Sequence, residues 1–537
     1  MFSRHQGTQD RPMPHLPFRP RLKAGVGPAI LLLVLSLPLA SAAHAAQGDP
    51  TILATMSPLL LLAWLVPLGV LLVAWGGLTE TQAGNAAAAA LATLGLAVAG
   101  YTLIGFGLQY GGIGCLHDLP GLAQLNAEYT FIRFGQSWGL AGMSGFGLSE
   151  QNPATLALFL SELPRLMTAA LIPALVLYRQ GRGWASAAIG LAVAAILYPL
   201  IGNWTWAGGP TGKVLCAVNT GGWLGNLGVN SGLGHGFIDF GSVGAVHLLG
   251  GSVALAALLA FGPRLPPGNE MPPAHLPLLA AAGALIWAAV WPSWTAGHLL
   301  YQGAALPWAL VSINALAGAG AGTLAAQAYS WLTTARPDAL MAVRGFAAGL
   351  IAAGAGAPFL TPGQALLVGL IAGVLVPLVV YAVEHGLRTH DPTGAVAVHL
   401  CGGLIGLIAV GLLAGGSVGA GWNGVGADTA LGTGGRAVAG LLAGDRGQLW
   451  AQLVGIIVIV LGGLGPAWLI FQAVRAATSA RLARRYPLPI APRLEQEAAD
   501  LSGLASAGAE EEKVASGFSA GIKETQEEPP LSPLSNP

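Results

Sequence analysis

Charged residues are scarce in this chain of 537 residues, because Asp, Glu, Lys and Arg together make up only 9% while hydrophobic residues make up 54%. A soluble fold needs a charged surface, so this balance nearly excludes one. The formal net charge is zero and no basic patch stands out, which argues against a nucleic-acid partner. The three cysteines are too few for a disulfide framework. The class that remains is the polytopic membrane protein.

Long apolar runs fill the chain instead, and glycine is abundant, with 80 residues and no collagen period. Small residues let helices approach each other closely in lipid. Eleven runs have the length that a hydrocarbon layer of about 30 Å requires. They are 56–76, 86–108, 153–178, 184–204, 239–262, 276–301, 305–331, 340–357, 363–385, 393–416 and 449–476. The sequence therefore predicts an all-α membrane protein with eleven transmembrane helices.

The two ends of the chain differ from its apolar middle. Residues 1–47 have the basic stretch, the apolar core and the A-x-A cleavage site of a signal peptide, with an uncleaved signal-anchor helix as the alternative. Residues 48–477 form the predicted transmembrane domain, and 478–537 a polar C-terminal tail, partly disordered. The loops rich in arginine fall inside if the N-terminus is outside. We therefore expect a bacterial inner-membrane protein with a cytoplasmic C-terminus.

One segment occurs twice. Residues 239–251 read DFGSVGAVHLLGG, and residues 391–403 read DPTGAVAVHLCGG. In each copy an aspartate precedes a histidine by eight residues, so His247 and His399 are equivalent positions. An internal repeat sets the architecture of a fold. A titratable ring inside an apolar span is expensive and usually serves a function.

The repeat also predicts how the two histidines meet. Spans one to five and six to ten form two halves, and because five is odd the halves have opposite orientations, as in an inverted repeat. Eight helical residues rise about 12 Å, which brings both rings near the midplane from opposite sides. The predicted fold is thus two inverted five-helix repeats plus a C-terminal helix, with His247 and His399 in contact.

These segments resemble the ammonium transporter/Rh family. The resemblance covers about residues 56–500, and it includes RGFAAGLIAAGAGAPFLTPGQALLVGLIAG (344–373) and YPLIGNWTW (198–206), which are similar to the family's eighth and ninth helices and to the end of its fourth. It implies the ammonium transporter fold, a homotrimer with one pore per subunit, and transport of ammonium or ammonia without a cofactor. In that mechanism a cation is recruited outside and deprotonated, and twin histidines relay the proton.

The resemblance assigns roles to individual residues. It makes His247 and His399 the twin histidines, for which two satisfied core histidines are the alternative. Trp206 falls on the outer-vestibule tryptophan, whose ring face attracts a cation, although an interfacial tryptophan is also common. Asp239 supports the vestibule or caps its helix, and Asp391 caps the other copy.

The sixth span departs from the family pattern. Where the family has a phenylalanine gate followed by Asn-Ala-Gly-Ser, this chain puts Trp294 at the gate, Thr295 at the Asn and His298 at the Ser. A neutral histidine can accept a hydrogen bond there, but a protonated one is a poor cation ligand. In the tenth span Gly394 stands where many members carry an aspartate.

The third span departs further. Aligned on its proline it has no aromatic residue at the two expected positions, and a shifted alignment offers Phe159 as one possible gate. Glu162 and Arg165 lie three residues apart on one helical face and can pair. An intramembrane charge pair marks a functional site by default. A pair at a trimer interface is the alternative.

Smaller features leave further alternatives open. Cys115 and Cys216 both fall in outside loops, where a disulfide could persist. The tail segment 481–497 resembles one that receives a P-II-type signal protein. No metal site is expected, since two histidines are too few ligands. A sensor that signals through its tail, or a channel for another neutral molecule such as carbon dioxide, are the alternative functions, and an enzyme is the weakest.

Overall fold

The computed structural model describes residues 61–115, 121–179, 183–206, 222–261, 272–298, 306–426 and 435–485. The predicted signal peptide, Cys216 and the tail beyond residue 485 lie outside these ranges. By their internal contacts, residues 1–471 form one compact unit and residues 472–537 a second. The described part of the second unit is the end of one helix.

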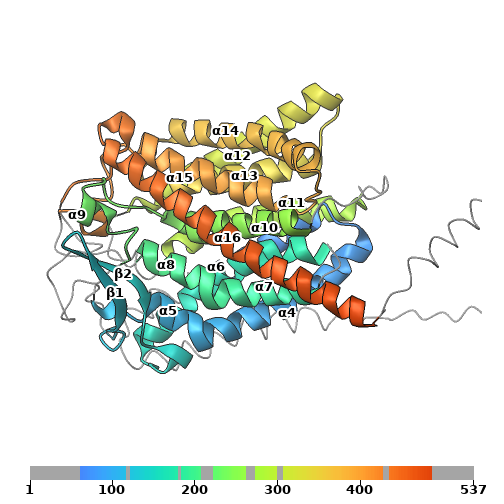
Figure 1. Cartoon of the computed structure of the whole chain (residues 1–537). Helices are drawn as coiled ribbons and strands as arrows, with labels where there is room; N and C mark the ends of the chain where they lie inside the picture. The colour runs from blue at the N-terminus through green and yellow to red at the C-terminus, as the bar shows by residue number, and fades with distance from the viewer. Residues whose placement is uncertain are drawn as a thin grey trace, which may run out of the picture. The chain divides into compact units, whose positions relative to one another are not determined.

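The described residues are mainly helical (Figure 1). The α-helices are α3 (Leu65–Trp75), α4 (Glu80–Gly100), α5 (Phe106–Tyr110), α6 (Pro153–Arg179), α7 (Gly183–Ala192), α8 (Tyr198–Trp206), α9 (Leu227–Ser231), α10 (Leu249–Phe261), α11 (His275–Ala296), α12 (Trp308–Thr334), α13 (Ala339–Ala355), α14 (Pro362–Tyr381), α15 (Cys401–Leu413) and α16 (Arg446–Arg485). One antiparallel hairpin pairs β1 (Glu128–Arg133) with β2 (Gln136–Gly142). π-Helical segments continue several helices, namely η1 (Tyr101–Gly105), η4 (Val193–Leu197), η6 (Val243–Leu248), η8 (Ala382–Gly386) and η9 (Val396–Leu400).

Long apolar helices lie in most of the predicted spans. Within the described ranges, nine helices are long and apolar enough to cross a membrane. Two shorter apolar helices, Leu61–Trp75 and Ala339–Ala355, lie where the sequence predicts two further spans. The second span begins earlier than predicted, at Glu80, because Thr79 and Gln82 form a reciprocal capping box there. The multi-pass helical architecture is therefore confirmed.

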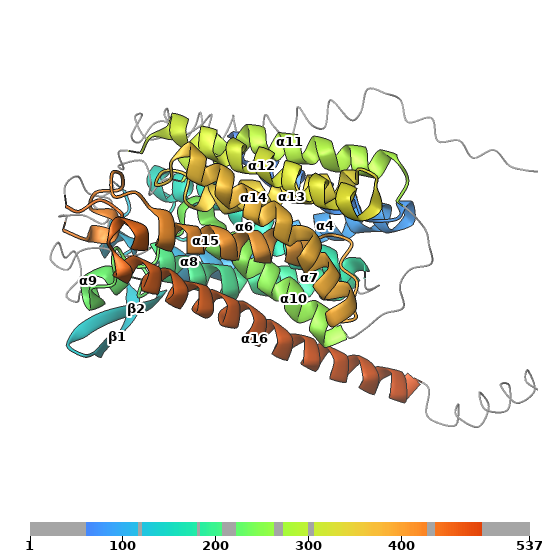
Figure 2. The ribbon, with the colours of Figure 1, turned by 90° about the horizontal axis from the view of Figure 1, so that it is seen from above.

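The two halves of the chain repeat the same neighbours. In the first half α4 packs on α6 and α7, and α6 packs on α10. In the second half α12 packs on α13 and α14, and α13 packs on α15, as the adjacent ribbons in Figure 2 show. The first helices of the halves, α3 and α11, pack on each other. The sequence repeat is thus also a repeat of packing.

The paired glycines of the two HLxGG segments explain how closely the halves approach. A Cβ atom placed on Gly251 would lie 2.5 Å from the backbone nitrogen of Leu400, which no side chain tolerates. A Cβ atom placed on Gly403 would lie 3.2 Å from the backbone nitrogen of Leu248. Each glycine therefore makes room for the residue that follows the histidine of the other half.

The repeated aspartates begin the two helical segments that carry these histidines. Asp239 accepts backbone hydrogen bonds from Gly244 at 2.5 Å and Ala245 at 2.9 Å. Asp391 accepts them from Gly394 at 3.1 Å and Val396 at 3.0 Å. Both carboxylates satisfy N–H groups that the first helical turn leaves unpaired. π-Helical turns such as η6 and η9 are rare and often occur at functional sites.

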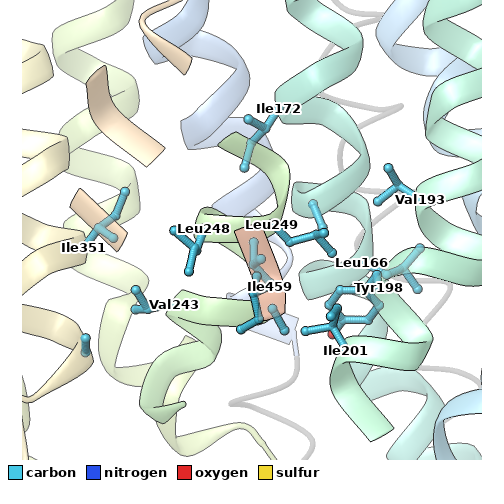
Figure 3. Packing of buried hydrophobic residues seen from close by; sticks show 14 of the residues in the cluster. Leu166, Ile172, Val193, Tyr198, Ile201, Val243, Leu248, Leu249, Ile351 and Ile459 are labelled. Carbon is cyan, nitrogen blue, oxygen red and sulfur yellow. The ribbon is translucent and has the colours of Figure 1, made fainter. Parts of the chain in front are cut away.

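Apolar side chains from both halves and from α16 fill the interior. Figure 3 shows Val243 and Leu248 of the fifth span among Leu166 of α6, Ile351 of α13 and Ile459 of α16. All five side chains are buried in one cluster. This packing surrounds η6 on several sides and fixes the position of the histidine that it carries.

Two glutamines of α16 support the non-helical stretch just before η5 (Phe240–Ser242). Gln452 Oε1 accepts from the Ile238 N–H at 2.8 Å, and its Nε2 donates to the Ile238 carbonyl at 3.0 Å. Gln448 makes the same two-sided contact with the His235 N–H and the Gly236 carbonyl, both at 2.9 Å. Buried backbone groups outside a helix need such partners, because the bilayer interior supplies no water.

Replacing Gln452 by leucine is expected to destabilise the protein by about 2–6 kcal/mol, because the N–H and the carbonyl of Ile238 both lose a partner and each loss costs about 1–3 kcal/mol. The unfolding midpoint in detergent measures this effect. Gln472→Leu, a half-buried glutamine of the same helix, is the matched control. Equal midpoints for both variants would contradict the role of Gln452.

The hairpin buries one acidic side chain outside the spans. The Glu128 carboxylate packs so closely on Gly112 that a Cβ atom there would lie 2.1 Å from Oε2. Burial raises the pKa of Glu128 from 4.5 to about 7, and the Asn203 side chain offsets part of that rise. Nearby, Cys115 is disulfide-bonded, whereas Cys401 is a free, buried thiol.

This raised pKa makes stability depend on pH. The folded state keeps a proton on Glu128 that the unfolded state releases, so stability falls as pH rises from about 4.5 to 7. The loss amounts to about 3 kcal/mol. Melting temperatures between pH 5 and 8 should fall less steeply in Glu128→Gln than in wild type. Parallel curves would refute the assignment.

Candidate functional site

The two imidazoles of the repeat meet in the interior, as the sequence predicts. His247 on η6 and His399 on η9 place their Nδ1 atoms 3.1 Å apart, and their ring planes differ by only 12°. His247 is fully buried and His399 is 6% exposed. In this contact one Nδ1 carries a hydrogen and donates it to the other Nδ1. The donor ring therefore has an unprotonated Nε2, and the acceptor ring carries its hydrogen on Nε2. The pair can therefore pass a proton along its length.

Two tryptophans of α11 border this pair. The Trp287 ring lies 5.4 Å from the His247 ring and 5.9 Å from the His399 ring, measured between centroids. Trp294 stacks on His247 at 6.3 Å. Trp287 was not identified from the sequence, although Trp287, Trp291 and Trp294 recur at the i, i+4, i+7 spacing of one helical face. All three indoles are buried.

Trp206 lies at the end of α8, beside His298. Their ring centroids are 5.1 Å apart, and the Tyr198 ring lies 6.1 Å from Trp206. Trp206 is 8% exposed and His298 is fully buried. The predicted vestibule residues Trp206 and His298 therefore share one site, with Tyr198 as a third member that was not identified from the sequence.

A buried carboxylate joins this aromatic site. Glu162 lies 3.0 Å from His298 Nε2 and accepts hydrogen bonds from the Tyr198 hydroxyl at 2.5 Å and from Gln109 Nε2 at 3.0 Å. Its Oε1 is 3.7 Å from Arg165 Nη1. Both charged side chains are at most 1% exposed in this unit. The pair therefore lies in the interior of this chain and not on a surface that another chain could cover.

The Arg165 guanidinium is held on several sides. It donates to the carbonyls of Ser161 and Trp294, and its Nε donates to Ser242 Oγ at 3.1 Å. Its central carbon lies 5.1 Å from the centroid of the Trp294 ring, which is cation–π geometry. Trp294 in turn donates from Nε1 to the Gly241 carbonyl at 2.7 Å. Arg165 thus connects α6 and α11 to the start of the helical segment that bears His247.

The remaining predicted site residues lie beside these groups. Phe159 packs on Tyr101 at 5.5 Å and Phe106 at 5.6 Å, so its ring belongs to that aromatic cluster, and its gate role stays a prediction. The Thr295 hydroxyl donates to carbonyls of its own helix. Gly394 has φ of +71°, and a Cβ atom there would lie 2.8 Å from Arg344 Nε, which explains glycine at this position.

Among the described residues, no group of three His, Cys, Asp or Glu side chains is placed to hold a metal ion. The groups that lie around the twin histidines and Trp206 are imidazoles, indoles and the pair of Glu162 and Arg165. These groups bind cations and exchange protons.

Known proteins share the sequence pattern and the fold. Residues 54–485 match the model of the Ammonium Transporter Family. This chain belongs to the ammonium transporter family. The ammonium transporter Amt2 of Archaeoglobus fulgidus is 31% identical over 360 residues, covering 65% of this chain and 72% of the relative. The ammonium transporter of Bacillus subtilis is 29% identical over 328 residues, covering 60% and 70%.

Solved structures related to this ammonium transporter family member share its fold. A protein described as a sensor Amt protein aligns with a TM-score of 0.59 at 24% identity, covering 78% of this chain and 91% of its own. Mep2 of Candida albicans aligns with a TM-score of 0.61 at 19% identity, covering 79% and 84%. At these identities the likeness establishes the fold alone.

Compared with the ammonium transporter family pattern, the charged pair is the main departure. The family resemblance implies phenylalanines in the third and sixth spans. In this member Trp294 stands at the sixth-span phenylalanine and His298 at the serine that follows it, while the third span carries the pair Glu162 and Arg165. The pair was expected from its spacing, whereas its contacts with Gln109 and Tyr198 were not, because those residues lie on other helices.

Proposed function

We propose that this protein carries ammonium nitrogen across the membrane, with ammonium held at Trp206 and neutral ammonia passing the twin imidazoles. The observation that carries the proposal is the 3.1 Å contact between the buried histidines of the two repeated segments. A charge at the bilayer centre costs at least about 2.5–3.5 kcal/mol on insertion scales. Leaving the proton behind avoids this cost for the nitrogen, and membership of the family supports ammonium as the substrate.

The proton takes a separate route in this proposal. One N–H bond of ammonium breaks, the proton moves to a neutral imidazole of the pair, and ammonia and imidazolium result. The pair holds a single extra proton, because two adjacent charged rings repel each other. Ammonia recovers a proton on the far side, so no bond of the substrate is changed overall. We therefore infer a transporter and no enzymatic activity.

We extend the proposal to the assembly and its place in the cell. Residues 1–47 act as a signal peptide, residues 48–477 form the transmembrane domain, and residues 478–537 form a cytoplasmic tail. The arginine bias of the loops supports a bacterial inner membrane with the N-terminus outside. The family resemblance supports a homotrimer whose tail receives a P-II-type signal protein. Native mass spectrometry and protease access to the tail in oriented vesicles test these points.

A sensor is the second candidate function. Trp287 lies against both imidazoles, and a large indole there favours a protein that binds ammonium with little flux. The fold likeness to a protein described as a sensor Amt protein agrees with this reading. Signalling would then pass through the C-terminal tail to a separate partner.

An ammonium concentration jump applied to proteoliposomes on a solid-supported membrane separates the two functions. Transport of nitrogen and proton predicts a current that saturates with ammonium concentration and exceeds that of empty liposomes. A sensor predicts no current together with saturable ammonium binding to the purified protein. Absence of both would reject ammonium as the ligand.

Trp206→Leu should raise the half-saturating ammonium concentration about fivefold, because the indole face contributes roughly 1 kcal/mol to holding a cation. The current jump assay at graded ammonium concentrations measures this shift. Trp450→Leu makes the same change at a tryptophan that is 60% exposed on α16, and it serves as the control. An unchanged half-saturation in Trp206→Leu would reject the cation–π assignment.

A further inference from the structure

The pair formed by Glu162 and Arg165 lies within a membrane span, where charge is costly. The two residues are one helical turn apart on α6, and both are buried. Replacing such a pair by apolar side chains is often neutral or stabilising, so stability alone is a weak reason for it. Ionised residues inside a span mark function by default. The surroundings of the two charges indicate what that function is.

The negative end lies on the side of Trp206. Glu162 contacts Tyr198 and His298, at 2.5 Å and 3.0 Å respectively. These two residues are the ones whose rings pack on Trp206, at 6.1 Å and 5.1 Å. A carboxylate behind an aromatic ring adds to the attraction that the ring face has for a cation.

The positive end lies on the side of the twin imidazoles. Arg165 lies over the Trp294 ring, and Trp294 stacks on His247. Arg165 also donates to Ser242, the residue directly before η6, on which His247 lies. Three residues along α6 correspond to a rise of about 4.5 Å, so the two charges are separated along the helix axis.

We propose that Glu162 and Arg165 form a fixed, oriented dipole that attracts a monovalent cation to Trp206 and repels it from the passage beside His247. This assignment rests on the proposed function. It names the residues that let a cation bind at Trp206 and keep it from passing His247 as a cation. A metal cation such as potassium finds attraction at the mouth and repulsion one turn deeper. Ammonium differs, because it can leave its proton on the imidazoles and continue as ammonia.

One further acidic group, Asp239, contributes to the net charge of this region. Asp239 interacts electrostatically with both members of the pair. The charges of Glu162 and Arg165 cancel, and Asp239 adds one negative charge when it is ionised, which would suit the binding of one cation. The orientation of the pair decides where that cation is held.

Reversing the pair is the sharpest test, because Glu162→Arg/Arg165→Glu keeps both charges and their spacing while it inverts the dipole. We expect the half-saturating ammonium concentration to rise by about tenfold, the effect of losing about 1.4 kcal/mol of binding. We also expect a potassium current that wild type lacks. Glu162→Gln/Arg165→Gln removes both charges together and covers the case in which the reversed pair does not fold.

The control is Glu80→Gln/Arg336→Gln, which removes one charge of each sign at exposed positions. Unchanged half-saturation and no potassium current in a folded pair variant would overturn the proposal. A raised half-saturating ammonium concentration without a potassium current would overturn the part of the proposal in which Arg165 excludes cations from the passage. If wild type gives no current, the proposed transport is wrong, and ammonium binding to the purified protein then tests the dipole. Unchanged binding in the reversed pair would overturn the dipole proposal. Weakened binding would support recruitment of ammonium by the dipole.

Discussion

Replacing His247 by alanine, alone or together with His399→Ala, is expected to lower the ammonium-driven current about 100-fold. General acid–base groups typically contribute 10²- to 10⁴-fold, and about 100-fold is the lower end of that range. The physical reason is that a lone imidazole has no neighbour to which the proton can pass. Without that route the proton stays on the nitrogen, and the ion must cross a layer that disfavours charge.

The control for this experiment is His275→Ala, which removes an exposed histidine at the start of α11. Its current should equal that of wild type. Size-exclusion profiles identify variants that have lost their fold, so that lost current is attributed to chemistry. A wild-type current in the double alanine variant would rule out the proton relay while leaving the fold assignment intact.

The second large effect concerns stability. Glu162→Leu leaves the Arg165 guanidinium buried without its carboxylate, and breaking a buried pair in this way costs about 3–5 kcal/mol. Glu162→Leu/Arg165→Met removes both charges and is expected to be less destabilised than the single variant, because no unpaired charge remains and only neutral groups such as the Tyr198 hydroxyl and Gln109 lose a partner. Unfolding midpoints in detergent compare the single and the double variant.

The contrast between these variants matters more than either value. Glu80→Leu deletes an exposed carboxylate of α4 and should leave the midpoint within about 0.5 kcal/mol of wild type. If Glu162→Leu behaves like Glu80→Leu, then Glu162 does not stabilise Arg165. If the double variant is as unstable as the single one, the loss comes from packing and neutral hydrogen bonds, and not from the unpaired charge.

The sequence predicted the parts of the site that are encoded twice. His247 and His399 could be placed because matching segments occupy matching positions, and a helical rise converts spacing into depth. The aspartates at the helix starts followed from the same repeat. Helix ends were predicted less well, as at Glu80, where a local capping box between Thr79 and Gln82 extends the helix beyond the hydrophobic run.

Contacts between helices that share no pattern could not be predicted. The spacing of Glu162 and Arg165 indicated a pair, but the approach of His298, Tyr198 and Gln109 depends on how α6 is rotated against its neighbours. The position of Trp287 against both imidazoles depends likewise on the rotation of α11. Periodicity specifies a face of a helix, whereas packing selects what that face touches.

The glycines that follow the two histidines limit how the molecule can move. Gly251 packs against the backbone of Leu400, and Gly403 packs against the backbone of Leu248, so the two halves are in close backbone contact at two places. Many carriers work by rocking one repeat against its mate to expose a site alternately to each side. Here such rocking would have to break both glycine–backbone contacts at once. We therefore expect the backbone to stay fixed during transport, so that the substrate passes as through a channel and only side chains and protons move.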